Sequence, residues 1–360
     1  MSSAPENFWA GRRVLVTGHT GFKGAWLTAW LVRLGARVSG FALAPEPPAS
    51  LEVPSLFDAL GLAGRVDHTI GDVRDLEHLA RVVRERSPEI VLHLAAQPLV
   101  RRSYREPLAT LATNVMGTAN VLEACRGLDG LRAVVVVTTD KVYENREHVW
   151  AYREPEPLGG HDPYSASKAC AELVTSTYRA SFLREAGVGV ATARAGNVIG
   201  GGDWSEDRLI PDLVRGIAAG RTTAIRNPGA VRPWQHVIDP LAGYLRLAER
   251  LASEPARYAE AWNFGPPADE RIEVGAVVER FVAAMGRGHV TLGHVDRSAP
   301  HEASELRLDS AKARLLLPWT PKLSLDEAIQ WTASAYRAAL EDGASIAAIV
   351  DEQLEAYARR

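Results

Sequence analysis

The chain has few cysteines, no long hydrophobic run and almost no net charge. Its 360 residues include two cysteines, Cys125 and Cys170, which excludes a disulfide framework and a cysteine-based zinc cluster. No stretch approaches the ~20 apolar residues of a membrane span, and the first residues carry no apolar signal-peptide core. The net charge of −3 disfavours nucleic-acid binding, which needs clustered positive charge. We expect a cytoplasmic protein with no metal and with no nucleic-acid or membrane partner.

Lysine is also scarce. Of the 41 basic residues only five are lysines, at positions 23, 141, 168, 312 and 322. Because arginine supplies the charge almost everywhere else, a lysine indicates a place that needs a compact ammonium or an amine able to lose its proton.

Apolar runs alternate with segments of helical periodicity through the first half of the chain. Strands are predicted near residues 14–16, 38–43, 65–70, 90–94, 133–137 and 188–194, with long helices at 108–125 and 165–185. Strands separated by helices favour a parallel sheet with right-handed crossovers. The predicted fold class is therefore α/β, with a Rossmann-type doubly wound sheet.

Three glycines, Gly18, Gly21 and Gly24, follow the first predicted strand in the sequence TGHTGFKG. Glycines let the backbone approach a pyrophosphate, whose charge the N-terminus of the next helix stabilises. A plain structural turn is the alternative, but the position directly after the opening strand favours a dinucleotide site. The expected contacts come from Gly18, Thr20, Gly21, Phe22, Lys23 and Gly24, and from Asp72, Val73, Leu94, Ala95 and Ala96 at later strand ends.

The end of the second predicted strand leaves the choice of cofactor less defined. An acidic residue there would favour NAD and an arginine would favour NADP, but neither is present, and Glu46 is the nearest acid. Asp72, after the third strand, is expected to contact the adenine or to cap the next helix. We expect the cofactor to be NAD.

These features suggest two parts of the chain. We predict an NAD-binding domain over residues 1–195, with a returning segment at about 236–265. Residues 196–235 and 266–345 would form a smaller mixed α/β substrate lobe, with helices near 211–219, 273–285 and 325–340. Residues 346–360 are predicted to form a C-terminal helix on the surface.

Two groups of residues carry the candidate chemistry. Tyr164 and Lys168 stand four residues apart, so both lie on one face of a helix, where the ammonium would lower the pKa of the tyrosine and make it a usable base. Thr139, Asp140 and Lys141 follow the buried strand at 133–137, and ligands bind at the carboxyl ends of parallel strands. A salt bridge at the strand end is the alternative interpretation of Asp140 and Lys141.

The glycine turn and the Tyr-x-x-x-Lys spacing together resemble the short-chain dehydrogenase/reductase superfamily. The length and second lobe resemble its extended branch, whose members act on nucleotide sugars. Epimerases of that branch carry small residues where Asp140 and Lys141 stand, whereas sugar 4,6-dehydratases carry an acid–base pair. With the stretches LAAQPLVR (94–101) and RPWQHV (232–237), the pair is similar to the CDP-glucose 4,6-dehydratases over about residues 8–331.

The resemblance implies a lyase that converts CDP-glucose to CDP-4-keto-6-deoxyglucose, with an NAD-dependent 4-epimerase as the alternative. Tyr164, aided by Lys168 and Thr139, would take the hydroxyl proton as NAD⁺ oxidises C4. Lys141 would remove the C5 proton and Asp140 would protonate the leaving C6 hydroxyl before hydride returns to C6. A neutral Lys141 needs a pKa lowered by burial or by Lys168. Lys141 would otherwise position a water or stabilise the enolate.

The same resemblance implies substrate contacts and a partner subunit. The substrate contacts are Gln97, Arg101, Asn197, Arg208, Arg232 and His301, of which the arginines suit phosphate oxygens. A homodimer would form through the helices at 108–125 and 165–185. The usual setting of such enzymes is bacterial surface polysaccharide synthesis.

Overall fold

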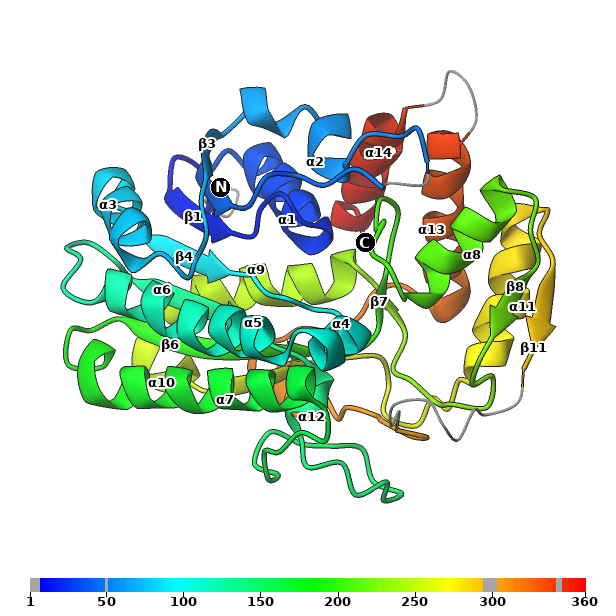
Figure 1. Ribbon diagram of the computed structural model, residues 1–360. Coiled ribbons are helices and arrows are strands. Elements are labelled where there is room, and N and C mark those ends of the chain that lie inside the picture. Colours follow the sequence, from blue (N-terminus) through cyan, green and yellow to red (C-terminus); the bar gives the residue numbers. More distant parts are fainter. Residues whose placement is uncertain (1–6, 49–50, 294–302, 341–344) are drawn as a thin grey trace, which may run out of the picture.

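The computed structural model describes residues 7–48, 51–293, 303–340 and 345–360. Its centre is a seven-stranded parallel sheet in the order β10-β6-β5-β4-β1-β2-β3 (Figure 1). The strands are β1 Arg13–Thr17, β2 Arg37–Ala42, β3 Asp67–Ile70, β4 Ile90–His93, β5 Ala133–Val137, β6 Gly189–Ala195 and β10 Ala261–Phe264. The predicted parallel, doubly wound α/β sheet is confirmed.

Helices cover both faces of this sheet, which explains the nearly continuous apolar runs in its central strands. In β5, Val134 and Val136 share a core with α3 (Leu76–Arg86) and α6 (Gly117–Cys125). Val135 faces the opposite side, where the core includes residues of α1 (Phe22–Arg33) and α9 (Ile238–Ser253). The α7 helix (Pro163–Tyr178) runs beside α6 (Figure 1).

Both long helices predicted in the first half are interrupted by π-helical turns. The first consists of α5 (Pro107–Leu111), a π-helical turn at Ala112–Met116 and then α6, and it follows α4 (Val100–Arg105). The second is α7 followed by a π-helical turn at Arg179–Leu183. A single extra residue per turn only rotates the apolar face, so the periodicity did not reveal these turns.

The other elements form a smaller lobe around its own hydrophobic core. This core joins α8 (Leu209–Ala218), α11 (Val274–Met285) and α13 (Leu325–Leu340), which lie together on the right of Figure 1. The lobe also holds the parallel pairs β8 (Thr223–Ile225) with β11 (Val290–Leu292) and β7 (Val198–Ile199) with β9 (Gln235–His236). Between them the chain returns to the main sheet as α9 and β10. The domain limits given above remain a prediction.

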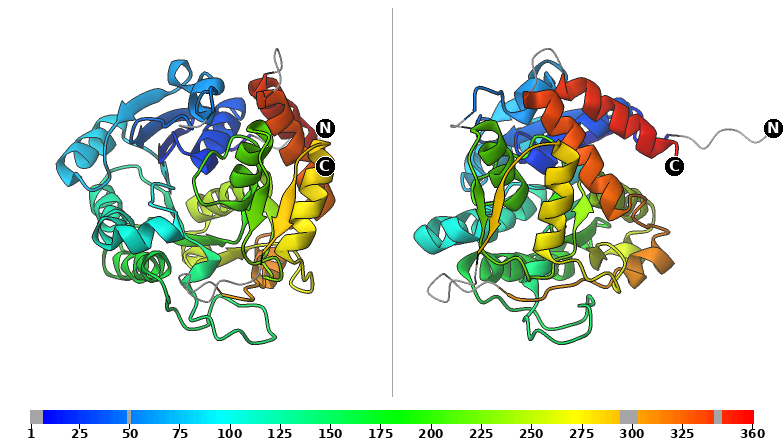
Figure 2. Two further views of the ribbon diagram at one scale, coloured as in Figure 1. Left: turned by 45° about the vertical axis from the view of Figure 1, so that its right-hand side comes forward. Right: turned by 90° about the vertical axis from the view of Figure 1, so that its right-hand side faces the viewer.

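The C-terminal helix α14 (Ile346–Ala358) packs against α13, as both views in Figure 2 show in red and orange. Its apolar face is buried through Val350, Leu354 and Tyr357. The remaining short elements are α2 Leu56–Ala59, a 3₁₀ turn at Leu62–Gly64, a 3₁₀ turn at Asp140–Val142, α10 Pro255–Tyr258 and α12 Ala311–Leu316. Within the described ranges, no helix combines the length and apolarity that crossing a bilayer requires.

Candidate active site

A cavity of about 2020 Å³ lies at the carboxyl ends of the sheet strands, beside the smaller lobe. Pockets for one small ligand usually measure about 300–1,000 Å³, so this cavity can hold a dinucleotide and a nucleotide sugar together. Every described residue that the sequence analysis assigned to the site lines it. His301 lies outside the described residues.

The glycine turn between β1 and α1 has the shape of a diphosphate cradle. Gly18 has a φ of 74°, and a Cβ on it would lie 2.6 Å from the backbone nitrogen of Ala95. A Cβ on Gly24 would collide with the carbonyl oxygen of Gly18. Gly21 precedes α1 and no side chain caps the helix, so its first amides are available to an anion. These residues fit the diphosphate of a dinucleotide.

Asp72 is engaged by an arginine that the sequence analysis overlooked. Arg74 donates from Nε to both carboxylate oxygens of Asp72, at 3.0 and 2.9 Å, and this hydrogen bonding holds the pKa of Asp72 below its usual value. Both residues line the cavity. The helix that follows is capped by Asp75, which accepts from the backbone of His78. The interpretation of Asp72 as the helix cap is therefore wrong.

Asp140 lies just beyond β5, and only one of its two carboxylate oxygens is hydrogen-bonded. Oδ1 accepts from the Thr139 hydroxyl at 2.9 Å, whereas the buried Oδ2 has no partner. Burial raises the pKa of Asp140, and the charge of Lys141 only partly opposes this. The raised pKa shifts Asp140 toward the protonated form that a proton donor requires.

Tyr164 and Lys168 both face the cavity from α7 but affect each other less than expected. Burial raises the pKa of Tyr164 to about 12, and the cation that chiefly opposes the rise is Arg208. Lys168 donates from Nζ to the carbonyl of Val137 at 3.0 Å, and burial lowers its own pKa to about 8. The expectation that the pKa of Tyr164 is lowered is therefore wrong, because burial outweighs the neighbouring cations.

The lysine whose pKa is lowered furthest among those the structure describes belongs to the glycine turn. Removal from water lowers the pKa of Lys23 to about 7, and the positive charges of Arg208 and Lys168 act in the same direction. Lys141, for which burial was one of the two expected ways to a neutral amine, keeps partial exposure. The sequence analysis assigned Lys23 to the cofactor alone because the turn gives no sign of where its side chain points.

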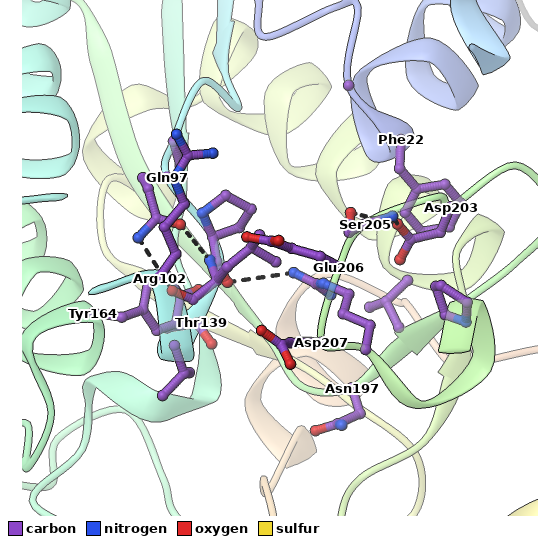
Figure 3. Close-up of a pocket in the computed structure, with 18 of the residues that line it drawn as sticks. Phe22, Gln97, Arg102, Thr139, Tyr164, Asn197, Asp203, Ser205, Glu206 and Asp207 are labelled. Carbon is purple, nitrogen blue, oxygen red and sulfur yellow. Dashed lines mark hydrogen bonds between the residues drawn. The ribbon is translucent and has the colours of Figure 1, made fainter. Parts of the chain in front are cut away.

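The expected substrate residues that the structure describes line the same cavity as the candidate catalytic residues. Figure 3 shows Thr139 and Tyr164 on one side and Asn197 and Asp207 on the other. Asp207, which was not predicted, lies within ion-pair distance of three arginines. The Nη-to-carboxylate distances are 3.8 Å for Arg101, 3.8 Å for Arg105 and 3.7 Å for Arg226.

The side chains of two predicted substrate residues, Gln97 and Arg232, form hydrogen bonds within the protein. The side-chain amide of Gln97 donates to Thr110 at 2.8 Å, and its oxygen accepts from the amide of Leu99, so it fixes the turn after β4. The buried Arg232 donates to the carbonyl oxygens of Val231 and Ala303. Arg208 begins α8 and reaches the carbonyl of Pro98 at 3.4 Å.

Asn114, in the first π-helical turn, connects the cavity wall to α7. It accepts from the amide of Gln97 at 2.8 Å and donates to the carbonyl of Gln97 and to the Ser167 hydroxyl. A polar residue in a helical pattern usually faces water, so the sequence gave no reason to single it out. In the part of the chain that the structure describes, no group of three or more His, Cys, Asp or Glu side chains is arranged to hold a metal.

Comparisons with known proteins agree with this geometry. The family model described as GDP-mannose 4,6 dehydratase matches residues 15–332. A CDP-glucose 4,6-dehydratase of Salmonella typhimurium is 50% identical over 329 residues, which are 90% of either chain. The solved dTDP-glucose 4,6-dehydratase of Streptomyces venezuelae with NAD bound has a TM-score of 0.75 at 25% identity, covering 90% of this chain and 97% of that one. A UDP-glucose 4-epimerase of Thermus thermophilus in complex with NAD has a TM-score of 0.76 at 27% identity, with 91% and 99% covered.

Proposed function

Because the chain belongs to the GDP-mannose 4,6-dehydratase family of the extended short-chain dehydrogenase/reductase superfamily, we propose that it converts CDP-glucose to CDP-4-keto-6-deoxyglucose. The chain is an NAD-dependent nucleotide-sugar dehydratase, a lyase of the EC 4.2.1 type. The observation that carries the reaction class is Asp140, an acid with a raised pKa and an unpartnered oxygen at the cavity wall. The 50% identity to a CDP-glucose enzyme supports the nucleobase.

The cofactor is NAD, for which the glycine turn and the strand ends after β3 and β4 provide the site. When bound, NAD would supply the hydride acceptor for oxidation at sugar C4 and the hydride donor for C6. The amides at the start of α1, with Lys23, would hold its diphosphate. Thr20, Asp72, Val73, Ala95 and Ala96 line the same cavity and would complete the cofactor site.

The chain's own residues move the protons. Tyr164 takes the proton of the 4-hydroxyl, while Thr139 orients that hydroxyl and Lys168 supports the phenolate. Once C4 is a ketone, the C5 proton is acidic and Lys141 removes it. Asp140 then protonates the departing C6 hydroxyl, so one water leaves and a C5–C6 double bond forms. Hydride return to C6, with a proton returned to C5 from Lys141, would give the 4-keto-6-deoxy sugar. The arginines at the cavity opening, with Asn197, hold the diphosphate of the nucleotide sugar.

A 4-epimerase shares Thr139, Tyr164 and Lys168 but requires no acid at C6. A buried carboxyl with an unpartnered oxygen would then cost stability without a chemical role. The buried Asp140 therefore favours the dehydratase.

The first experiment incubates the protein and NAD with CDP-, dTDP-, UDP- and GDP-glucose separately and follows the product mass. Loss of one water from the CDP sugar alone is the expected result. Water loss from another nucleotide would preserve the reaction and change the substrate. An unchanged mass with all four would overturn the dehydratase, and epimerisation would then be sought by NMR.

Asp140→Asn provides the sharpest variant. It retains the shape of the side chain and removes the proton donor, so water elimination should fall by about 10²-fold or more, the usual contribution of a general acid. Oxidation at C4 should persist and appear as absorbance of reduced cofactor at 340 nm. Undiminished water loss in this variant would remove Asp140 from the mechanism.

We also propose that the protein forms a homodimer and acts in the cytoplasm. Exposed apolar side chains gather along α5 to α7 at Leu108, Leu111, Met116 and Leu173, and we assign this surface to the partner subunit. Cys125 and Cys170 are both free thiols, which suits the reducing cytoplasm.

A further inference from the structure

A buried ion pair lies behind the wall that carries Thr139, Asp140 and Lys141. Glu172, two turns after Tyr164 on the same face of α7, meets Arg194 of β6 through two hydrogen bonds, at 2.9 and 2.8 Å. Both side chains are 4% exposed. Neither residue lines the cavity, so the pair does not contact a ligand there.

Each member of the pair holds one end of the catalytic segment, which we define as residues 138–143. At the first end, the Thr138 hydroxyl donates to Glu172 Oε1 at 2.5 Å. At the other end, Arg194 Nη1 donates to the Tyr143 hydroxyl at 2.9 Å, and that hydroxyl donates to Asn263 of β10 at 2.7 Å. The segment between these ends bends through a 3₁₀ turn and carries all three candidate catalytic groups of this wall.

We propose that Glu172 and Arg194 are positioning residues, which clamp both ends of the catalytic segment so that Asp140 and Lys141 meet the sugar in the geometry of water elimination. This inference rests on the proposed function. Misplacement of a reacting group by about 1 Å can cost about 10²-fold in rate, so a segment that is not part of a regular strand gains from such anchoring.

The two hydroxyl groups that donate to Glu172 allow a positioning role to be distinguished from an electrostatic effect on Lys168. The charge of Glu172 also opposes the lowering of the Lys168 pKa. Glu172 Oε2, however, accepts from the Thr192 hydroxyl at 2.7 Å, and Thr192 belongs to β6 rather than to the catalytic segment. Thr138 and Thr192 are thus two buried hydroxyls on one carboxylate, and only Thr138 anchors the segment.

The test compares Thr138→Val with Thr192→Val. Each replacement keeps the side-chain shape, removes one hydrogen bond to Glu172 and preserves the ion pair, which a substitution of Glu172 would break at the risk of misfolding. Thr138→Val should lower kcat for water loss by about tenfold or more with KM within about threefold, and Thr138→Ser should restore most of it. Both variants should lower the melting temperature by a similar amount, because each loses one buried hydrogen bond. Thr192→Val should change kcat by less than about twofold.

A second measurement needs no substrate. Hydrogen–deuterium exchange of the ligand-free chain should become faster at residues 138–143 in Thr138→Val and stay unchanged there in Thr192→Val. Equal exchange in both variants, or equal kcat losses, would overturn the positioning role. If the wild-type protein turns over no nucleotide sugar, the proposed function fails while the exchange measurement still decides this inference.

Discussion

Lys23 is a side chain on which charges of both signs act. Burial is the main cause of its lowered pKa, the charges of Arg208 and Lys168 lower it further, and Asp140 and Asp203 raise it. With a pKa of about 7, its amine is half neutral near physiological pH before any ligand binds. A diphosphate placed beside it adds negative charge and raises that pKa, so ligand binding and proton binding become linked.

We therefore expect NAD binding at pH 8 to take up a proton. Above a pKa of about 7 the free amine is mostly neutral, and the bound diphosphate recharges it. At pH 6 the amine is already charged and the uptake should vanish. Calorimetric titrations in buffers of different ionisation enthalpy measure the number of protons.

Lys23→Met should abolish the uptake at pH 8 and weaken NAD binding by about tenfold. The matched control is Lys312→Met, which removes a lysine whose partner is Glu260 and which does not line the cavity. Proton uptake that survives in Lys23→Met would place the linkage elsewhere, with Lys168 as the next candidate.

The turn between β1 and α1 contains two glycines whose substitutions should differ sharply. Gly24→Ala drives a Cβ into the carbonyl of Gly18, and backbone cannot move aside as a side chain can, so we expect a loss of about 3 kcal/mol in stability. Gly21→Ala places its Cβ 3.4 Å from the same oxygen and should cost about 1 kcal/mol or less. Thermal unfolding of the two variants compares them, and equal losses would mean that the turn does not pack as described.

The start of α9 and the end of α14 are joined by a buried carboxyl. Asp239 Oδ1 accepts from the backbone of Lys322 at 2.7 Å and from the Tyr357 hydroxyl at 2.8 Å, while its other oxygen is unpartnered. Burial raises the pKa of Asp239 to about 6, against these hydrogen bonds, which lower it.

This pKa predicts an unusual pH dependence of stability. Because the folded state binds the Asp239 proton more tightly than the unfolded chain does, the contribution of Asp239 falls as pH rises from about 4 to about 6, by at most about 3 kcal/mol. Asp239→Asn removes the titration. The melting temperature of the wild type relative to this variant should thus be higher at pH 4.5 than at pH 7.5. A constant difference would contradict the raised pKa.

Local sequence patterns predicted the elements that depend on local rules, and missed those that depend on distant partners. The apolar run at 133–137, the glycine turn and the Tyr164–Lys168 spacing each express a constraint within a few residues. The pairing of Glu172 with Arg194, the direction of the Lys23 side chain and the place of Arg74 arise only when separate elements meet. β10, with four residues, was too short to show a period and appeared only as part of a returning segment.

The folded chain exposes an apolar surface along α5 to α7 that would be buried in a dimer. Leu108, Met116 and Leu173 are 80%, 56% and 57% exposed on neighbouring helices, and such a patch suits a subunit interface. Met116→Glu combined with Leu173→Glu should convert a dimer to monomers in light scattering, because burying two carboxylates costs several kcal/mol per ion.

The control for this variant uses equally exposed apolar side chains elsewhere. Val149 and Trp150 are each 73% exposed in the loop before α7, away from α5 and α6. Val149→Glu with Trp150→Ser should leave the molar mass unchanged. If the wild type is a monomer, or if the control variant also dissociates, the assignment of the surface is wrong.

The position of β10 in the sheet also affects how the chain can be synthesised. β6 is buried along its whole length, yet its outer neighbour is made 66 residues after β6 ends. At about 5–20 residues per second, a ribosome leaves that apolar edge without its strand for roughly 3–13 s. During this interval the nascent chain carries an unpaired strand edge that could pair with another chain. Pairing with β10 thus ends the period in which the edge of β6 is unpaired during synthesis.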